Sequence, residues 1–271
     1  MTVLYTFILS AVLALILGFL LGIFKKIFFV PVDEAVAKVR AVLPGANCGA
    51  CGYAGCDSYA AAVAAGNAPT NACAAGGASV AAAVADAVGK EGGAVEKKAA
   101  LLACQGGLEF AQAKAEYCGV KSCQGAKIAV NGVKLCPYGC IGFGDCVAVC
   151  AFGALSMGSD GLPRIDYAKC VGCGACQRAC PQGLFALVSE SQKGVIALCS
   201  NRTTNRPTVL KSCKKGCIKC SKCVTSCPEK AIELVNGIPK VDYTKCTSCG
   251  TCIAGCPTKV LAFISDIEKT A

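Results

Sequence analysis

The sequence contains no histidine and no tryptophan. The absence of histidine excludes an imidazole metal site and removes the side chain that most often acts as a general base near neutral pH. No glycine-rich phosphate-binding loop follows a strand-like segment, so the sequence shows no nucleotide or flavin site. Cysteine is the residue in excess, with 25 among 271 residues. Any metal chemistry of this chain must therefore be thiolate chemistry.

The cysteines favour metal binding over disulfide bonds. Disulfide-dense chains are typically short and secreted. This chain is longer, and it contains tightly clustered Cys-x-x-Cys runs. That spacing suits adjacent ligands of a metal cluster, and a reducing compartment would keep the thiols free for it.

An uncharged segment from Val3 to Phe24 has 22 residues, enough to cross the hydrocarbon core of a bilayer as a helix. A cleaved signal peptide is the alternative, but it would have a basic start and a shorter apolar core. Here Lys25 and Lys26 follow the apolar segment, which favours a cytoplasmic C-terminal side. We expect one transmembrane span, with everything after it in the cytoplasm.

The run Cys-x2-Cys-x2-Cys-x3-Cys-Pro occurs three times. In two-cluster ferredoxins the first three cysteines of such a run hold one [4Fe–4S] cluster, and the fourth binds the other cluster. This crossing predicts two ligand sets in the C-terminal repeat. They are Cys217, Cys220, Cys223 with Cys256, and Cys246, Cys249, Cys252 with Cys227.

The preceding repeat is less regular. One ligand set follows the same rule and consists of Cys170, Cys173, Cys176 and Cys150. In the other run Phe143 stands where a cysteine is expected, and Ala151 replaces the proline. We expect this set to be Cys136, Cys140, Cys146 and Cys180. The alternative is a three-thiolate site, with a three-iron cluster or a non-cysteine ligand.

A third motif lies nearer the membrane segment. Cys48, Cys51 and Cys56 are close together, Cys73 follows seventeen residues on, and glycines separate the first three. Glycine lets backbone amides approach the sulfurs, and N–H···S bonds tune the reduction potential of a cluster. Five clusters would use twenty cysteines. Those left over are either inert thiols or ligands of a sixth cluster: Cys104, Cys118, Cys123, Cys199 and Cys213.

The second half of the chain contains an internal repeat. Residues 163–170 match residues 239–246 at a shift of 76. Asp160-Gly161 and Asn236-Gly237 lie between strand-like pieces, and both pairs favour tight hairpin turns. A helix is expected over residues 31–43 from apolar spacing, and a second over residues 79–88 in a zone rich in alanine and glycine. A repeat this small buries little apolar area, so its clusters must form part of its core.

The net charge of +10 treats every cysteine as neutral. An oxidised [4Fe–4S] cluster with four thiolates carries about −2. Five clusters would bring the holoprotein close to neutral, so the basic balance does not indicate a nucleic-acid partner.

Two other functions remain open at this point. A zinc-filled structural module is one, although triple Cys-x2-Cys-x2-Cys runs fit zinc poorly. A radical-SAM enzyme is the other, because Cys213, Cys217 and Cys220 have its spacing. The run continues through two more cysteines, and no long alternation of strands and helices follows.

The order of features resembles the B subunit of the Rnf ion-translocating ferredoxin:NAD oxidoreductase complex. The specific part is the stretch over residues 43–56 with Cys73, preceded by a membrane segment and followed by ferredoxin-like runs. Two ferredoxin-like units, with Cys-Pro-Tyr-Gly-Cys at 136–140, look like the longer form found in anaerobic bacteria. The departures are Ala151 and the alanine-rich stretch 74–90.

The resemblance implies an electron-relay subunit of an ion translocase, with no organic active site of its own. It implies that the chain takes electrons from soluble ferredoxin and passes them to other membrane, Fe–S and flavin subunits. The transported ion would be Na⁺ or H⁺, and the location a bacterial cytoplasmic membrane. Ferredoxins are usually acidic, so a group of lysines is expected to steer docking. These are Lys211, Lys214, Lys215, Lys219, Lys222 and Lys230.

The expected fold is α+β, with an N-terminal transmembrane helix, a small Fe–S domain and two tandem bacterial 2[4Fe–4S] ferredoxin-like units. The expected boundaries are a transmembrane anchor over 1–30, a four-cysteine [4Fe–4S] domain over 31–90, a linker with accessory cysteines over 91–135, and ferredoxin-like units over 136–198 and 199–271.

Overall fold

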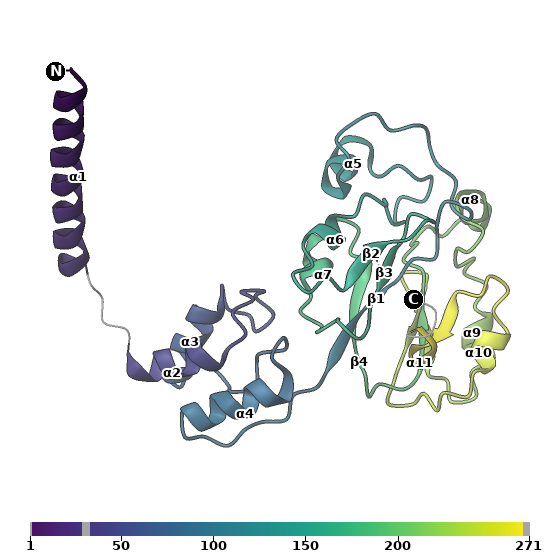
Figure 1. Cartoon of the computed structure of the whole chain (residues 1–271). Helices are drawn as coiled ribbons and strands as arrows, with labels where there is room; N and C mark the ends of the chain where they lie inside the picture. Colours follow the sequence, from purple (N-terminus) through teal and green to yellow (C-terminus); the bar gives the residue numbers. More distant parts are fainter. Residues whose placement is uncertain (1, 29–32, 268–271) are drawn as a thin grey trace.

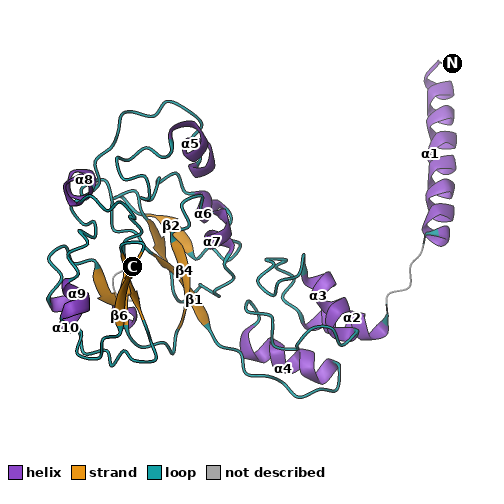
Figure 2. Ribbon diagram, turned by 180° about the vertical axis from the view of Figure 1, so that it is seen from behind, coloured by secondary structure: helices purple, strands orange, loops and turns teal. Residues whose placement is uncertain are grey.

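The computed structural model describes residues 2–28 and 33–267. Three parts follow one another along the chain: the isolated helix α1, a small helical domain, and a larger part that holds all the strands (Figure 1). Figure 2 shows from behind that helices carry the first two parts, whereas short strands and long loops carry the third. This is the order of parts that the sequence predicts.

Helix α1 spans Thr2–Ile27. Its segment Leu4–Ile27 is 24 residues long, and no part of its most apolar window is buried inside the structure. Among the described residues, no other helix has the length and apolar composition to cross a membrane. A helix that is apolar on all sides and packs against nothing in its own chain needs a lipid or protein environment.

The helical domain consists of α2 (Glu34–Val42), α3 (Cys56–Ala64) and α4 (Gly77–Ala87). Asp33 caps the N-terminus of α2, because its carboxylate accepts a hydrogen bond from the Ala35 amide at 2.9 Å. The core of the domain joins Val39, Tyr59 and Val84. Helices α2 and α4 lie where helices were expected, over residues 31–43 and 79–88, and their ends differ from those bounds by one to three residues. Residues 31 and 32 lie outside the described residues.

In the first ferredoxin-like unit, the first strand along the chain pairs with the last. Strand β1 (Lys98–Leu102) pairs antiparallel with β4 (Phe185–Ser189), and β2 (Leu155–Met157) forms a hairpin with β3 (Pro163–Ile165). The short helices α6 (Asp145–Ala148) and α7 (Ala175–Ala179) follow the cysteine loops, and α5 (Cys123–Val130) lies outside this framework.

The second unit repeats the arrangement. Strand β5 (Val195–Ala197) pairs with β8 (Leu261–Phe263), and β6 (Ile232–Val235) pairs with β7 (Ile238–Val241). The helices of this unit are α8 (Arg206–Ser212), α9 (Lys222–Thr225), α10 (Thr251–Ala254) and α11 (Ile264–Ile267). The turn residues Asn236 and Gly237 have φ of 50° and 73°, as the expected Asn-Gly hairpin requires.

The strand pairing reaches beyond the unit boundaries expected from the cysteine runs. Residues 98–102, expected in the linker, form a strand with the end of the first unit. Residues 195–197, expected in the first unit, pair with the end of the second. The reason is that each unit needs an outer strand on both sides of its cysteine loops to cover them, and the cysteine spacing alone does not reveal that strand.

Candidate iron–sulfur centres

The structure gathers 24 of the 25 cysteines into six groups of four, which we call sites 1 to 6. Site 1 is Cys48, Cys51, Cys56 and Cys73; site 2 is Cys150, Cys170, Cys173 and Cys176; site 3 is Cys123, Cys140, Cys146 and Cys180; site 4 is Cys104, Cys136, Cys199 and Cys213; site 5 is Cys217, Cys220, Cys223 and Cys256; site 6 is Cys227, Cys246, Cys249 and Cys252.

Site 5 brings together the four cysteines expected from the crossing rule. All four line one cavity beside Pro257 and Leu261. Cys256 accepts a hydrogen bond from the Val260 amide at 3.3 Å. Burial raises the pKa of Cys223 to about 11, and the neighbouring thiols of Cys217 and Cys220 add to the rise.

Site 3 differs from expectation because Cys123, and not Cys136, joins Cys140, Cys146 and Cys180 around one cavity. Asp145 at the start of α6 explains how Cys123 arrives there. Its carboxylate accepts hydrogen bonds from the amides of Cys123 and Gln124, at 2.8 and 3.0 Å. These amides begin α5, so Asp145 fixes the N-terminus of that helix against the cavity.

Three of the four cysteines of site 3, Cys123, Cys140 and Cys146, are buried. Burial raises the pKa of Cys140 to about 12, and that of Cys146 to about 11. A thiol in such surroundings stays protonated at neutral pH unless a metal displaces the proton. Metal binding would therefore convert these thiols to thiolates.

Site 4 lies between the two ferredoxin-like units and takes two cysteines from each. Cys104 follows β1, Cys199 follows β5, and the two residues form an isolated antiparallel bridge. Cys136 and Cys213 complete the lining of the cavity. In the sequence, Cys104 and Cys199 each directly follow a short apolar run. This shared position was the sequence signal for their pairing.

Hydrogen bonds to sulfur are concentrated at site 4. Cys199 accepts from the amides of Cys217 and Asn201, at 3.4 and 3.5 Å, and Cys104 accepts from the amide of Cys140 at 3.4 Å. The side-chain amide of the buried Asn201 donates to Cys136 at 3.5 Å. Such donors stabilise thiolate sulfur and bound clusters.

Sites 2 and 6 keep the expected sets. In site 2, burial raises the pKa of Cys173, and nearby Cys150 and Cys170 contribute. In site 6, burial raises the pKa of Cys252, with contributions from Cys249 and Cys227. Cys150 and Cys227 each accept a hydrogen bond at 3.3 Å from the amide four residues on, so the two loops have the same local geometry.

Site 1 belongs to the helical domain. Burial raises the pKa of Cys73, and Cys56, Cys48 and Cys51 add to it, so the distant fourth cysteine does return to the close three. Asn47 accepts the Cys56 amide hydrogen at 2.8 Å and ties the loop to the start of α3.

These groups suit cubanes better than single ions. Each thiolate of a [4Fe–4S] cluster binds a different iron, so the four sulfurs surround the cluster instead of meeting at one point. Within residues 2–28 and 33–267, no three metal-binding side chains converge on a single-ion site. At sites 3, 4 and 5 the four cysteines surround a cavity.

The radical-SAM spacing does not correspond to one site. Cys213 lines the cavity of site 4, whereas Cys217 and Cys220 line that of site 5. A radical-SAM cluster needs the three cysteines on one loop around one cluster, so the arrangement argues against that alternative. Cys118, which joins none of the six groups, is exposed.

Family comparisons agree with this arrangement. A family described as "Putative Fe-S cluster" matches residues 43–75, which contain site 1. Two families described as 4Fe-4S dicluster domain match the later part of the chain, one over residues 139–184 and 216–260 and the other over 169–232. The fold and the sites thus define a protein that carries [4Fe–4S] clusters for electron transfer.

Relatives identify the family. The chain is 46% identical over 234 residues to the B subunit of the Na(+)-translocating ferredoxin:NAD(+) oxidoreductase complex of Acetobacterium woodii, covering 86% of this chain and 70% of the relative. It is 40% identical over 228 residues to the B subunit of the ion-translocating oxidoreductase complex of Methanosarcina acetivorans, covering 84% and 86%. The chain belongs to the family of B subunits of ion-translocating oxidoreductase complexes, which confirms the resemblance drawn from the sequence.

Proposed function

We propose that the chain binds six [4Fe–4S] clusters and relays single electrons from reduced soluble ferredoxin to a partner subunit at the membrane. The complex would couple ferredoxin and NAD redox chemistry to the transport of Na⁺ or H⁺. A bound cubane supplies one-electron oxidation and reduction. The chain itself supplies the order of the sites, their burial and the hydrogen bonds to their sulfurs.

The observation that carries this proposal is the continuous row of sites. Sites 6 and 5 exchange the fourth cysteine of each run, so α9 and α10 join them directly. The Cys217 amide of site 5 donates to Cys199 of site 4 at 3.4 Å. The Cys140 amide of site 3 donates to Cys104 of site 4 at 3.4 Å. Cysteines of neighbouring sites are therefore in contact along this part of the row.

The row continues to the helical domain. Cys146 of site 3 lies close enough to Cys176 of site 2 to add to its raised pKa, after burial and the cysteines of its own site. Cys48 of site 1 acts in the same way on Cys173 of site 2, after burial. Arg178 joins these two loops, donating to the carbonyl oxygens of Cys48 and Cys173 at 2.7 and 3.2 Å.

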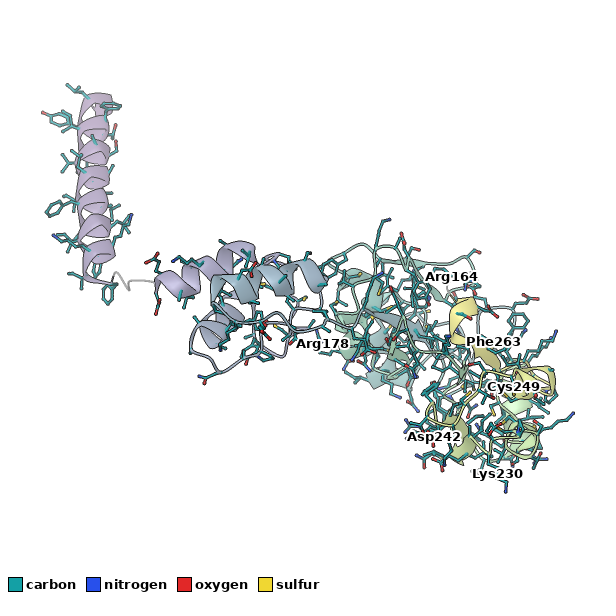
Figure 3. All side chains as sticks on the ribbon, turned by 90° about the horizontal axis from the view of Figure 1, so that it is seen from below. Arg164, Arg178, Lys230, Asp242, Cys249 and Phe263 are labelled. Carbon is teal, nitrogen blue, oxygen red and sulfur yellow. The ribbon has the colours of Figure 1, made fainter. Side chains whose placement is uncertain are left out.

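The far end of the row suits electron acceptance. Cys249 of site 6 is exposed, and its sulfur lies 3.4 Å from the Thr251 hydroxyl. The hydrogen bond from Thr251 holds the pKa of this thiol below its usual value. Figure 3 places Cys249 and Lys230 together at the end of the molecule opposite α1. A cluster with an exposed ligand at that end is accessible to a soluble donor.

The lysines of the expected docking group differ in their surroundings. Lys215 lies over the Phe110 ring, 5.0 Å from its centroid, and Lys219 donates to the Asn201 carbonyl oxygen. These two side chains are engaged within the chain. The other four are exposed and available to an acidic partner: Lys211, Lys214, Lys222 and Lys230.

The near end of the row suits transfer to the membrane. Site 1 lies in the domain that directly follows α1, and Lys25 and Lys26 lie in the last turn of that helix. By the positive-inside rule, these lysines support placement of all six sites on the cytoplasmic side of a bacterial cytoplasmic membrane. The membrane, Fe–S and flavin partners would receive the electrons there.

The experiment uses the full chain, reconstituted anaerobically with iron and sulfide in lipid nanodiscs. We expect about 24 irons per chain, from six clusters of four, and rapid reduction by reduced ferredoxin at low salt. A charge-reversed variant changes Lys214, Lys222 and Lys230 to glutamate. Reduction should slow by about tenfold or more and lose its salt dependence, because steering charges act mainly on association rates.

A control reverses Lys114 and Lys121, which are exposed in the segment between β1 and α5. It should leave reduction by ferredoxin unchanged. A wild-type chain that holds iron but is not reduced by ferredoxin would overturn the proposed role. Equal rates in the two charge-reversed variants would overturn the docking surface.

A further inference from the structure

Lys134 is a lysine with a buried side chain, which is rare unless the charge has a partner. Only 5% of its surface is exposed. Its ammonium group donates to the carbonyl oxygen of Gly106 at 2.7 Å. The ion pairs formed by the described residues do not include Lys134. No carboxylate therefore balances its charge from within this part of the chain.

The backbone around Lys134 is held on both sides. Lys134 forms an isolated antiparallel bridge with Ala113. The Lys114 amide donates to the Val133 carbonyl oxygen at 2.9 Å, and the Leu135 amide donates to that of Gln112 at 2.8 Å. The ammonium group is thus placed by a paired backbone and not by a mobile loop.

The anchor of the ammonium group lies against the sulfurs of site 4. A Cβ on Gly106 would meet Cys213 Sγ at 3.3 Å and Cys104 Sγ at 3.6 Å. Gly106 and the four cysteines line the same cavity. The backbone that anchors the ammonium group is therefore in close contact with two sulfurs of site 4.

We infer that Lys134 sets the reduction potential of site 4, because its buried positive charge favours the reduced form of the cluster held by Cys104, Cys136, Cys199 and Cys213. The inference rests on the proposed presence of a cluster at this site. Reduction adds one negative charge to the cluster. A fixed positive charge nearby in a low-dielectric interior stabilises that added charge and raises the potential.

The position of site 4 gives this charge a role in the relay. Site 4 joins the two ferredoxin-like units, so every electron that follows the row passes through it. A raised potential at site 4 makes electron transfer from site 5 more favourable than it would be without this charge. Lys134 would then act on the cluster electrostatically, through space, without binding iron.

The test compares three variants in the reconstituted full chain: Lys134→Met and Lys134→Gln, which remove the charge, and Lys134→Arg, which keeps it. The readout is an EPR-monitored redox titration, with iron and sulfide measured on the same samples. At the wild-type midpoint of site 4, both neutral variants should show a reduced-to-oxidised ratio at least about tenfold lower. This corresponds to about 59 mV for one electron.

The remaining five steps of the titration should not move, and Lys134→Arg should keep the wild-type potential. Lys121→Met is the control, because it removes an exposed and solvated charge; it should shift no step. Unchanged potentials in Lys134→Met and Lys134→Gln would overturn the inference. Loss of four irons in both neutral variants would also overturn it, since the lysine would then be needed to hold the cluster. A wild-type chain with fewer clusters would instead count against the proposed function.

Discussion

At the scale of the residue, burial separates cysteines that are otherwise alike. Cys118 and Cys123 are five positions apart, yet Cys118 is exposed and Cys123 is buried. The amide of Cys123 is held by Asp145, and its side chain lines the cavity of site 3. The spacing of the cysteines along the sequence assigns neither residue to a cluster. The difference in their burial therefore arises from the contact of Cys123 with α6.

The change Cys123→Ser should therefore remove the cluster of site 3, lowering iron by about four per chain. Cys118→Ser should lose no iron, and it should abolish labelling of the native protein by a maleimide under anaerobic conditions. Iron analysis, EPR and mass spectrometry measure these outcomes. Equal iron content in the two variants would contradict the assignment of Cys123 to site 3.

At the scale of the element, β1 packs directly over the loop of site 2. The Ala100 amide donates to Cys170 at 3.4 Å. Gly172 has a φ of 64°, and a Cβ there would lie 2.3 Å from the Lys98 carbonyl oxygen. The glycine thus serves two purposes, because it adopts a left-handed conformation and lets the strand approach the loop.

We expect Gly172→Ala to destabilise the holoprotein by about 2–4 kcal/mol, from conformational strain together with displacement of β1. Gly183→Ala is the matched control, since Gly183 has a φ of 62° and open space around its missing Cβ. It should cost only about 1–2 kcal/mol. Anaerobic denaturation, followed by cluster absorbance, compares the two. A cost for Gly172→Ala no larger than the control would argue against close packing of β1.

At the scale of the whole molecule, one side chain links the helical domain to the ferredoxin-like units. Figure 3 shows Arg178 where these two parts meet. Its guanidinium donates to the backbone of both cysteine loops, at Cys48 and Cys173. Arg178 is itself exposed, so water weakens this link, and we treat it as a docking contact and not as a source of fold stability.

Arg178→Gln should keep all the iron but slow electron transfer from site 2 to site 1 by up to about tenfold, the factor that about 1.4 kcal/mol of docking energy provides. Rapid freeze-quench EPR after reduction of site 6 measures this transfer. The control Arg164→Gln breaks an ion pair with Asp160 inside the first unit and should leave the rate unchanged. Unaltered transfer in Arg178→Gln would show that other contacts dock the helical domain.

The sequence by itself determined the local features of this protein. The apolar run predicted α1, and Asn236-Gly237 predicted the tight turn between β6 and β7. Asp160-Gly161 marked the hairpin of β2 and β3, although residues 158–162 form a longer connection there than the expected tight turn. The regular Cys-x2-Cys-x2-Cys runs predicted the groups at sites 5 and 6. Each of these features depends on residues that are near one another along the chain, or on a crossing rule shared by two-cluster ferredoxins.

The tertiary structure alone decided how the irregular cysteines are divided. Cys136 joins Cys104, Cys199 and Cys213 because the ends of β1 and β5 meet between the two units. Cys123 takes the place expected for Cys136 at site 3 because α5 is held against α6. Both outcomes depend on contacts between segments that are far apart in the sequence. The spacing of the cysteines along the chain does not show which of these segments come together. Lys134 lies buried near site 4, two positions before Cys136 but far along the chain from Cys104, Cys199 and Cys213.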